Sequence, residues 1–353
     1  MMGVLLSEPG DAPVDHSSPA MTSERLPESG VAQQGILTCP GEWQLHHRGT
    51  LQDAHIAWRL IGPTTAPLVC ALGGIWCDRH LEDQPGRRGS WGQLVGPGRA
   101  LDPDRVRILS FDYLGGAGES SGPLQERRFP SVSTYDQANA LARVLDALGV
   151  AALHAIIGGS YGGMVALAFA ERYPERISAV CTISAADRAH PMAIAWHSIQ
   201  RHIVRFALER GSPEQGLRLA RAVGLALYRS PEEFAARFSS VPQSENGRFV
   251  FPVERHLFAD DASPLESLRA EAFLCLSESL DLHQLEASRI CVRTTAVAAR
   301  EDQLVPLADV RALVARMPNA QLREITSIHG HDAYLRESAQ LREIIAEVLA
   351  AAA

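Results

Sequence analysis

The sequence predicts an α/β fold in which a mostly parallel sheet carries helices on both faces and is interrupted by a helical insert. Three observations support this prediction. Short apolar runs alternate with segments of helical periodicity, which is typical of βαβ units. A glycine-rich turn at residues 158–163 joins one apolar run to a helical pattern. The alternation stops at about residue 187 and resumes after residue 289, so one sheet domain with an insertion explains the whole pattern.

The predicted sheet elements follow one another along the chain. Strands are expected at residues 68–72, 106–111, 153–157, 177–183, 294–299 and 322–325. Helices are expected at residues 133–148, 162–173, 307–317 and 338–351. The first helix is the clearest, because Ala138, Leu141 and Leu145 recur at helical spacing and Gly149 follows as a C-cap.

Three regions follow from this pattern. Residues 1–40 are rich in Ser, Pro, Gly and acidic residues and lack periodicity, so we expect a disordered tail there. Residues 41–186 and 290–353 are expected to form the α/β core. The polar, strand-poor segment 187–289 is expected to form a helical lid.

The composition excludes several classes of protein. The chain has 353 residues, 46% of them apolar, and can bury a substantial core. A formal net charge of −8 argues against a nucleic-acid-binding protein, which usually has a basic face. No apolar run approaches the about 20 residues of a membrane span. The six cysteines form no CxxC pair, and Cys70 and Cys181 lie in apolar runs, so reduced buried thiols and a cytoplasmic location are expected.

The clearest chemical signal is a G-x-S-x-G motif from Gly158 to Gly162. A predicted strand precedes it and a helical pattern follows, which is the context of the nucleophile elbow in α/β-hydrolases. The glycines let the neighbouring backbone come close, and the helix N-terminus favours negative charge beside the serine. Ser160 is therefore the predicted nucleophile. The alternative is a glycine-rich turn with an idle serine.

A serine nucleophile needs a base, and the base needs an orienting acid. In this fold the chain order is Ser, then Asp or Glu, then His. Asp302 follows a predicted strand and is the favoured acid, with Glu301 and Asp281 as rivals. His329 and His331 both follow the next strand, and spacing alone leaves them nearly equal. They could also be a pair of metal ligands, but no third ligand has a suitable spacing, so no metal is expected.

An oxyanion hole should accompany the nucleophile. One donor is expected to be the N–H of Tyr161, the residue after Ser160. The second should come from the end of the strand at 68–72, where Leu72, Gly73 and Gly74 lie, and Leu72 is the predicted donor. The alternative for this segment is a plain β-turn.

These residues, taken together, resemble the homoserine O-acyltransferases of the MetX type, which belong to the α/β-hydrolase superfamily. Residues 112–123 (Asp-Tyr-Leu-Gly-Gly-Ala-Gly-Glu-Ser-Ser-Gly-Pro) are similar to the family's Asn-x-Leu-Gly-Gly-Cys-x-Gly-Ser-Thr-Gly-Pro. Residues 158–164 resemble its Gly-Ser-Met-Gly-Gly-Met elbow, and residues 330–335 its Gly-His-Asp-Ala-Phe-Leu. The pair Gln200-Arg201 resembles an arginine-bearing helix of the family.

The resemblance implies several residue roles. His331 occupies the Gly-His-Asp position and is therefore the implied base. Arg201 and Asp332 are implied to bind the carboxylate and the ammonium group of an amino-acid acceptor, which agrees with their charges. The resemblance also implies a homodimer formed through the insert.

The chain also departs from the family pattern. Cys70, Asp112, Ala117 and Tyr161 stand where the family has His, Asn, Cys and Met. These departures resemble a divergent proteobacterial branch, which implies succinyl transfer and leaves acetyl transfer open.

The implied activity is transfer of a succinyl group from succinyl-CoA to the hydroxyl of L-homoserine, a step of methionine biosynthesis, by a ping-pong mechanism. The alternatives are acetyl-CoA as donor, serine as acceptor, an esterase or thioesterase, and an inactive binding module. No cofactor is expected besides acyl-CoA as co-substrate. The insert would keep water from the acyl-enzyme, with Trp196, Arg201, Tyr228 and Phe234 as expected tunnel-wall residues.

Overall fold

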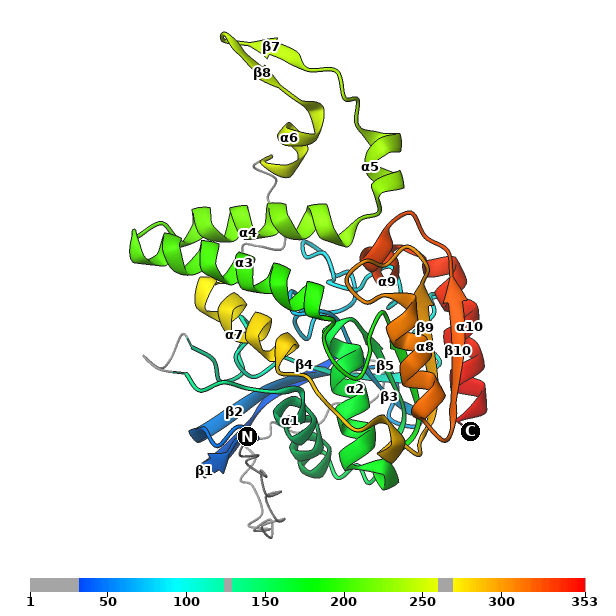
Figure 1. Cartoon of the computed structure of the whole chain (residues 1–353). Coiled ribbons are helices and arrows are strands. Elements are labelled where there is room, and N and C mark those ends of the chain that lie inside the picture. The colour runs from blue at the N-terminus through cyan, green and yellow to red at the C-terminus, as the bar shows by residue number, and fades with distance from the viewer. Residues whose placement is uncertain (1–31, 124–128, 260–268, 353) are drawn as a thin grey trace, which may run out of the picture.

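One eight-stranded sheet organises the protein, as the computed structural model of residues 32–123, 129–259 and 269–352 shows (Figure 1). The strand order is β1-β2-β4-β3-β5-β6-β9-β10. The strands are β1 (Gln33–Gln44), β2 (Thr50–Ile61), β3 (Leu68–Leu72), β4 (Arg107–Phe111), β5 (Leu153–Gly159), β6 (Ile177–Ile183), β9 (Arg293–Ala299) and β10 (Ala320–Ile325). Strands β1, β2 and β4 pair antiparallel, and all pairs from β4 to β10 are parallel. The predicted mostly parallel sheet is thus confirmed.

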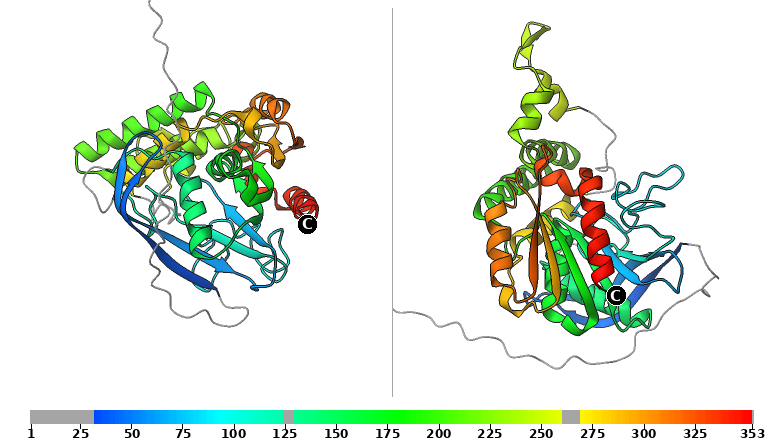
Figure 2. Two further views of the ribbon diagram at one scale, coloured as in Figure 1. Left: turned by 90° about the horizontal axis from the view of Figure 1, so that it is seen from below. Right: turned by 90° about the vertical axis from the view of Figure 1, so that its right-hand side faces the viewer.

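Helices cover both faces of this sheet (Figure 2). The covering helices are α1 (Thr134–Ala147), α2 (Tyr161–Arg172), α8 (Leu307–Arg316) and α10 (Ser338–Ala351). Side chains of a strand point to alternate faces, and the cores follow this rule. On β5, Ile156 packs in the core that contains α1 and α2, whereas Ala155 and Ile157 pack in the core that contains α10. Because both faces are buried, these strands read as continuous apolar runs rather than as alternating patterns.

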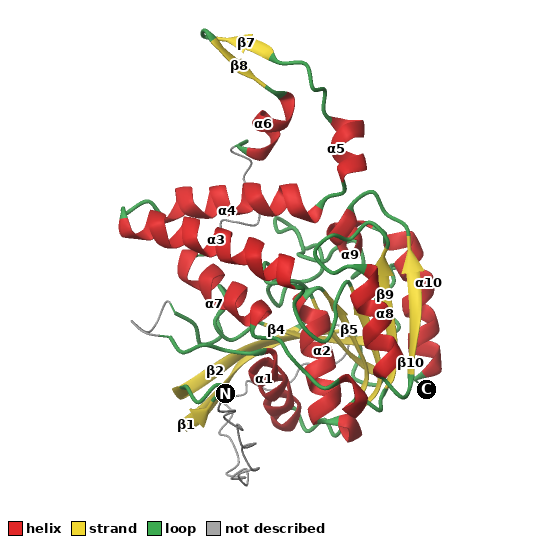
Figure 3. Ribbon diagram, in the orientation of Figure 1, coloured by secondary structure: helices red, strands yellow, loops and turns green. Residues whose placement is uncertain are grey.

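Within the described ranges, the segment between β6 and β9 contributes no strand to the main sheet. It consists of α3 (Pro191–Glu209), α4 (Pro213–Tyr228), α5 (Pro231–Arg237), the hairpin β7 (Gln243–Glu245) and β8 (Arg248–Val250), α6 (Pro252–Leu257) and α7 (Ala270–Asp281). Four of these helices begin with proline, whose fixed φ suits the first helical position and whose missing N–H costs nothing there. Figure 3 shows α3 and α4 as long red ribbons that run side by side over the sheet.

Short helical elements complete the chain. They are η1 (Pro174–Arg176), η3 (Ala287–Arg289), η4 (Gly330–Asp332) and α9 (Ala333–Arg336). Of these, η4 follows β10 and lies close to α4, and α9 continues the chain from η4. None of the helices in the described ranges is both long enough and apolar enough to cross a membrane.

The predicted boundary of the disordered tail at residue 40 is wrong. Residues 1–31 lie outside the described residues, but β1 begins at Gln33 and pairs with β2 over nearly its whole length. Only Leu37, Cys39 and Trp43 of this strand are buried, so its sequence reads as polar and irregular. A register shift between Cys39 and Glu42 further breaks the alternation. The antiparallel edge pair β1–β2 was therefore not predicted.

The cysteines agree with the predicted burial in part, since Cys39, Cys70 and Cys181 are buried, Cys77 and Cys275 are half-buried and Cys291 is exposed. All six lie in the described part of the chain as free thiols, and Cys70 and Cys181 are fully buried. Burial raises the pKa of the Cys181 thiol to about 12, so this sulfur stays protonated and packs as an apolar group.

Candidate active site

Ser160 lies at the sharp turn between β5 and α2, at the carboxyl edge of the sheet. Its backbone angles are φ 52° and ψ −120°, a conformation that a non-glycine residue rarely adopts. The turn is possible because two neighbours lack side chains. A Cβ on Gly162 would lie 2.2 Å from the Leu72 carbonyl oxygen, and one on Gly158 would lie 2.3 Å from the Gly162 oxygen. The two outer glycines of the motif are thus a steric requirement of the turn.

A chain of hydrogen bonds runs from Ser160 into the protein. Ser160 Oγ lies 2.8 Å from His331 Nε2, and His331 Nδ1 lies 2.8 Å from Asp302 Oδ2. The other oxygen, Asp302 Oδ1, accepts the backbone N–H groups of Leu304 and Val305, both at 2.9 Å. Since an ionised carboxylate only accepts, His331 donates through Nδ1 and is left with a bare Nε2 that accepts the Ser160 hydroxyl proton. The structure therefore brings the predicted nucleophile, base and acid together.

The environment of His331 favours its protonated form. Burial on its own lowers the pKa of the imidazole. The charge of Asp302, its hydrogen bond and the charge of Asp332 outweigh this effect, so the pKa of His331 is raised above its ordinary value. Such a group can take up the proton that leaves a serine hydroxyl.

The rival residues have other partners. His329 Nδ1 lies 3.3 Å from Glu233, away from Ser160. Glu301 accepts the N–H of Ser327 at 2.8 Å. Asp281 pairs with a second histidine, His197, at 2.7 Å. Geometry thus separates candidates that spacing alone left open.

The predicted oxyanion donors lie on either side of this turn. Leu72 is the last residue of β3, and Tyr161 is the first of α2, where N–H groups have no intrahelical acceptor. The carbonyl of Gly73 accepts the N–H of Gly162 at 3.0 Å and the hydroxyl of Tyr113 at 2.7 Å. These bonds fasten the end of β3 to the start of α2 beside Ser160.

A cavity of about 300 Å³ opens at Ser160 between the sheet edge and the insert. The core contributes Ser160, His331 and Asp332 to its lining. Helices α3 and α4 and the residue that follows α4 contribute the other wall, which includes His197, Arg221, Leu225, Tyr228 and Arg229. Leu225 and Tyr228 lie four and seven residues after Arg221, so all three share one face of α4. Of this wall only Tyr228 was predicted; the helical spacing of the other two on α4 was the available signal.

The two predicted substrate-binding residues have different positions. Asp332 lines the cavity, and its Oδ2 accepts Arg229 Nε at 2.8 Å. Burial raises the pKa of Asp332, although Arg229 and His331 oppose the shift. Arg201 points elsewhere, because it donates to the Ser277 carbonyl at 2.8 Å and pairs with Asp281 at 2.6 Å.

The predicted position of Arg201 in the substrate site is therefore not the one that the structure gives. Among the described residues that line the cavity, Arg201, Trp196 and Phe234 are not found. Helix α7 packs against α3, and its Asp281 holds the guanidinium of Arg201 on that side of the helix.

The segment 112–123 has a structural place beside the site. The buried carboxylate of Asp112 accepts the N–H groups of Arg79 and Glu119, each at 2.8 Å, and pairs with the Arg79 guanidinium. Asp112 thus ties the loop after β3 to the loop after β4. Asp112, which stands where the family pattern has asparagine, thus forms an ion pair with Arg79.

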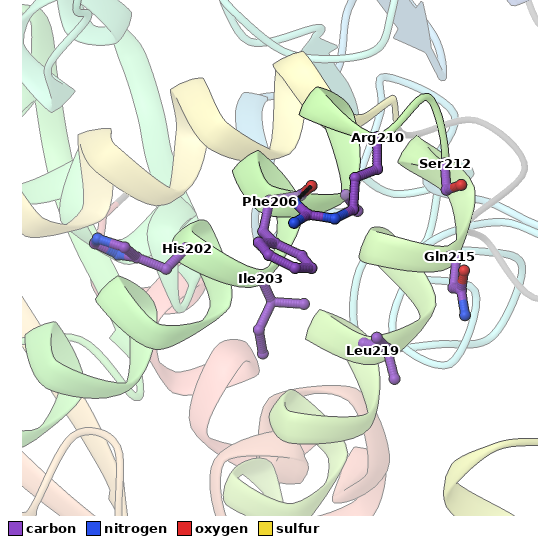
Figure 4. Close-up of a pocket in the computed structure, with 8 residues that line it drawn as sticks. His202, Ile203, Phe206, Arg210, Ser212, Gln215 and Leu219 are labelled. Atoms are coloured by element: carbon purple, nitrogen blue, oxygen red, sulfur yellow. Dashed lines mark hydrogen bonds between the residues drawn. The ribbon is translucent and has the colours of Figure 1, made fainter.

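Two further features lie away from this chemistry. Within the described ranges, no group of three or more His, Cys, Asp or Glu side chains could hold a metal ion. A separate hollow of about 470 Å³ lies at the outer ends of α3 and α4, where Phe206, Arg210 and Leu219 meet (Figure 4). It shares no lining residue with the cavity at Ser160.

Comparison with known proteins agrees with the geometry. The alpha/beta hydrolase fold family matches residues 85–337. A homoserine O-succinyltransferase from Xanthomonas campestris pv. campestris is 38% identical over 338 residues, which are 95% of this chain and 88% of that protein. A homoserine O-acetyltransferase from Thermus thermophilus is 37% identical over 75% of this chain and 73% of its own length. A serine O-succinyltransferase from Litchfieldella anticariensis is 33% identical over 89% of this chain and 98% of its own length.

Solved structures share the fold. The homoserine O-acetyltransferase from Bacillus anthracis superposes with a TM-score of 0.81 at 18% identity, covering 90% of this chain and 98% of that one. Esterase E22 superposes with a TM-score of 0.80 at 18% identity, covering 90% of this chain and all of that one. Transferases and esterases are equally similar in fold, so the fold alone does not distinguish transfer from hydrolysis.

Proposed function

Because this chain belongs to the α/β-hydrolase family, and within it to the homoserine O-acyltransferases, we propose that it transfers a succinyl group from succinyl-CoA to the hydroxyl of L-homoserine. The observation that carries the chemistry is the bonded series Ser160–His331–Asp302 at the floor of a cavity. The choice of succinyl is supported by the succinyltransferase from Xanthomonas, which is 38% identical over 95% of this chain.

In the first half-reaction, Ser160 Oγ attacks the thioester carbon while His331 Nε2 takes its proton. Negative charge develops on the thioester oxygen, and the N–H groups of Leu72 and Tyr161 are the proposed donors to it. Collapse of this intermediate breaks the carbon–sulfur bond. CoA leaves with the proton from His331, and the succinyl group remains as an ester on Ser160.

In the second half-reaction, the hydroxyl of homoserine takes the place of CoA. His331 accepts its proton, the alkoxide attacks the ester carbon, and the proton returns to Ser160 Oγ as O-succinylhomoserine leaves. Asp302 keeps the imidazole in the tautomer that both halves need. CoA departs before homoserine reacts, so the kinetics should be ping-pong. Acyl-CoA is the only co-substrate, and no further cofactor takes part.

Transfer requires that homoserine reaches the acyl-enzyme while water does not. We propose that the segment 187–289 acts as a lid over the core formed by residues 41–186 and 290–353, since α3 and α4 supply one wall of the cavity. Asp332, whose carboxylate lies in this cavity beside His331, is the proposed partner of the acceptor's ammonium group. The proposed setting is a cytoplasmic homodimer.

The experiment is a CoA-release assay with succinyl-CoA and acetyl-CoA, each tested with homoserine, with serine and with no acceptor. The proposal expects the fastest release with succinyl-CoA and homoserine, and slow release without an acceptor. Faster CoA release from acetyl-CoA than from succinyl-CoA would show that acetyl-CoA is the donor. Faster release with serine than with homoserine would show that serine is the acceptor. Full-rate release without any acceptor would make the protein a thioesterase, and no release from either donor would refute acyl transfer.

A further inference from the structure

We propose that Arg221 and His197 form a seat for the free carboxylate of the succinyl group and thereby select a succinyl donor over an acetyl donor. The inference rests on the proposed acyl transfer and adds the residues that recognise the end of the acyl chain. Both residues line the cavity that contains Ser160, and both come from the insert. The seat is therefore on the wall that faces a group attached to the serine.

Arg221 is a half-buried cation without a matching anion. It lies on the cavity face of α4, one turn before Leu225. No ion pair or hydrogen bond joins its side chain to another residue in the described ranges. A guanidinium is always charged at neutral pH and presents a planar fork that fits a carboxylate. Burying such a charge beside apolar walls is costly unless a ligand supplies the opposite charge.

The other arginines of the cavity are engaged or exposed. Arg188 pairs with Asp187 at 2.8 Å, and Arg229 pairs with Asp332 at the same distance. Arg336 is an exposed residue. Arg221 is thus the cavity arginine that combines partial burial with a free charge among the described residues.

His197 supplies the second contact. Only 4% of its surface is exposed, and its Nδ1 lies 2.7 Å from Asp281. Its Nε2 is buried and has no hydrogen-bond partner among the described residues, although the side chain lines the cavity. An unsatisfied buried polar atom is uncommon in proteins and calls for a partner. Because Nδ1 donates to Asp281, Nε2 carries a proton only in the imidazolium form, and a ligand carboxylate would accept the hydrogen bond of that N–H.

The residues around His197 hold it in place. Asp281 Oδ2 pairs with Arg201 at 2.6 Å, so the carboxylate that fixes the imidazole is fixed in turn. His197 and Arg201 lie four residues apart on one face of α3, and both reach Asp281. Asp281 thus connects His197 to Arg201, the residue that the family resemblance makes a carboxylate ligand.

Arg221 and His197 lie on neighbouring helices. The Gln200 side chain donates to the Ala220 carbonyl at 2.8 Å, which locks α3 and α4 together next to both residues. Figure 1 shows these helices running side by side across the carboxyl edge of the sheet. An acetyl group has no carboxylate to fill the seat, so acetyl-CoA would leave the charge unmatched.

The test compares kcat/KM for succinyl-CoA and acetyl-CoA, with homoserine as acceptor, in the full-length protein. Arg221→Gln and His197→Asn should each lower the succinyl-to-acetyl ratio by about tenfold or more, because a hydrogen bond to a charged group is lost. Asp281→Asn should lower the ratio in the same direction. Arg205→Gln, an exposed arginine of α3, is the matched control and should leave the ratio unchanged.

Two outcomes would overturn the seat. The first is an equal loss with both donors, or a rise in the KM for homoserine at a constant donor ratio, which would assign these residues to the acceptor. The second outcome is measured on the wild-type protein, so a misfolded variant cannot affect it. Succinyl-CoA should acylate it about tenfold faster or more than butyryl-CoA, which has the same chain length without the carboxylate, and equal rates would refute the inference.

The outcomes also keep the two proposals apart. Failure of the wild-type protein to transfer any acyl group to homoserine would refute the proposed function. Transfer with an unchanged donor ratio in the variants would refute only the seat.

Discussion

Ser160 Oγ and His331 Nε2 lie 2.8 Å apart, although 171 residues separate them along the chain. The serine follows β5 and the histidine follows β10, and only β6 and β9 lie between these strands in the sheet. All four strands run parallel, so their carboxyl ends share one edge. Asp302 follows β9 and completes the bonded series from the same edge. The parallel topology thus brings residues that are distant in the sequence to one edge of the sheet.

The first prediction concerns the acid. In Asp302→Asn, the amide oxygen can still accept the N–H groups of Leu304 and Val305, but the amide nitrogen then faces His331 Nδ1. That contact forces the proton of the imidazole onto Nε2, which can no longer accept from Ser160. The kcat should fall by about 10⁴ while the fold is kept.

Steady-state kinetics and circular dichroism check this result. Glu301→Gln is the matched control, because Glu301 accepts the N–H of Ser327 and does not contact His331. A variant of Asp302 with wild-type kcat would remove this residue from the mechanism.

The second prediction concerns pH. His331 must be neutral to accept the proton of Ser160, and its pKa is raised because Asp302 and Asp332 outweigh the effect of burial. The acid limb of kcat/KM should therefore have its midpoint above about 6.5, the usual value for histidine. Stability from this histidine is complete below that value and is lost as pH rises through the raised pKa. A midpoint below about 6.5 in the pH–rate profile would contradict the assignment.

The third prediction concerns Gly162, the second glycine of the G-x-S-x-G motif. A Cβ at Gly162 would lie 2.2 Å from the Leu72 oxygen, so Gly162→Ala must push α2 away from β3. We expect a loss of about 1–3 kcal/mol in the free energy of unfolding and a large loss of acylation rate. Gly41→Ala is the control, since no atom lies within 4 Å of its added Cβ and only its positive φ is strained. Chemical denaturation and acylation kinetics decide, and an active Gly162→Ala protein would refute the steric argument.

The fourth prediction concerns the buried ion pairs of Arg229. This side chain bonds Asp332 at 2.8 Å and Glu233 at 2.6 Å, and all three residues are largely buried. Arg229→Met would leave the buried Asp332 without its ion pair and Glu233 with only the longer contacts to His329 and Arg237, and it should cost about 3–5 kcal/mol of unfolding free energy. Arg237→Met, in a side chain 48% exposed and 3.6 Å from Glu233, should cost less than about 1 kcal/mol. Equal losses in the two variants, measured by urea denaturation, would show that burial of the pair is unimportant.

The fifth prediction concerns the proposed homodimer. Phe206 and Leu219 are exposed at the hollow of Figure 4, and Ile199 is a further exposed apolar residue of α3. Exposed apolar side chains that gather in this way favour association. Sedimentation velocity should show a wild-type dimer that Phe206→Glu dissociates. Phe249→Glu, on the hairpin β7–β8, should not change the mass, and a wild-type monomer would contradict the prediction.

The sequence was most informative where both faces of the sheet are covered. Strand β6 and helix α10 have the predicted bounds, because continuous apolar runs and helical spacing leave little ambiguity there. Strands β1 and β2 were missed. Edge strand β1 buries only Leu37, Cys39 and Trp43, and its register shift interrupts the alternation. Strand β2 alternates only in its first half and is buried continuously from Ile56 to Leu60, so it has no single period.

The sequence predicted the motif residues of the site but not the residues that helix packing places there. Residues fixed by a motif, such as Ser160 and His331, lie where the motif requires. Arg201 does not line the cavity, because a helix sequence gives its face but not the neighbour that the face meets. In the fold that neighbour is α7, and Asp281 captures the guanidinium. Arg221 and His197 were overlooked because neither belongs to a motif and the sequence does not show that their helix faces line the cavity.

The most direct test of the account is the mass of the intact protein after mixing with succinyl-CoA in the absence of an acceptor. The proposed mechanism predicts a covalent adduct of one succinyl group on Ser160 that homoserine discharges as O-succinylhomoserine. The adduct should be absent from Ser160→Ala. An adduct that forms equally on Ser160→Ala, or one that homoserine cannot discharge, would contradict the proposed nucleophile and the transfer built on it.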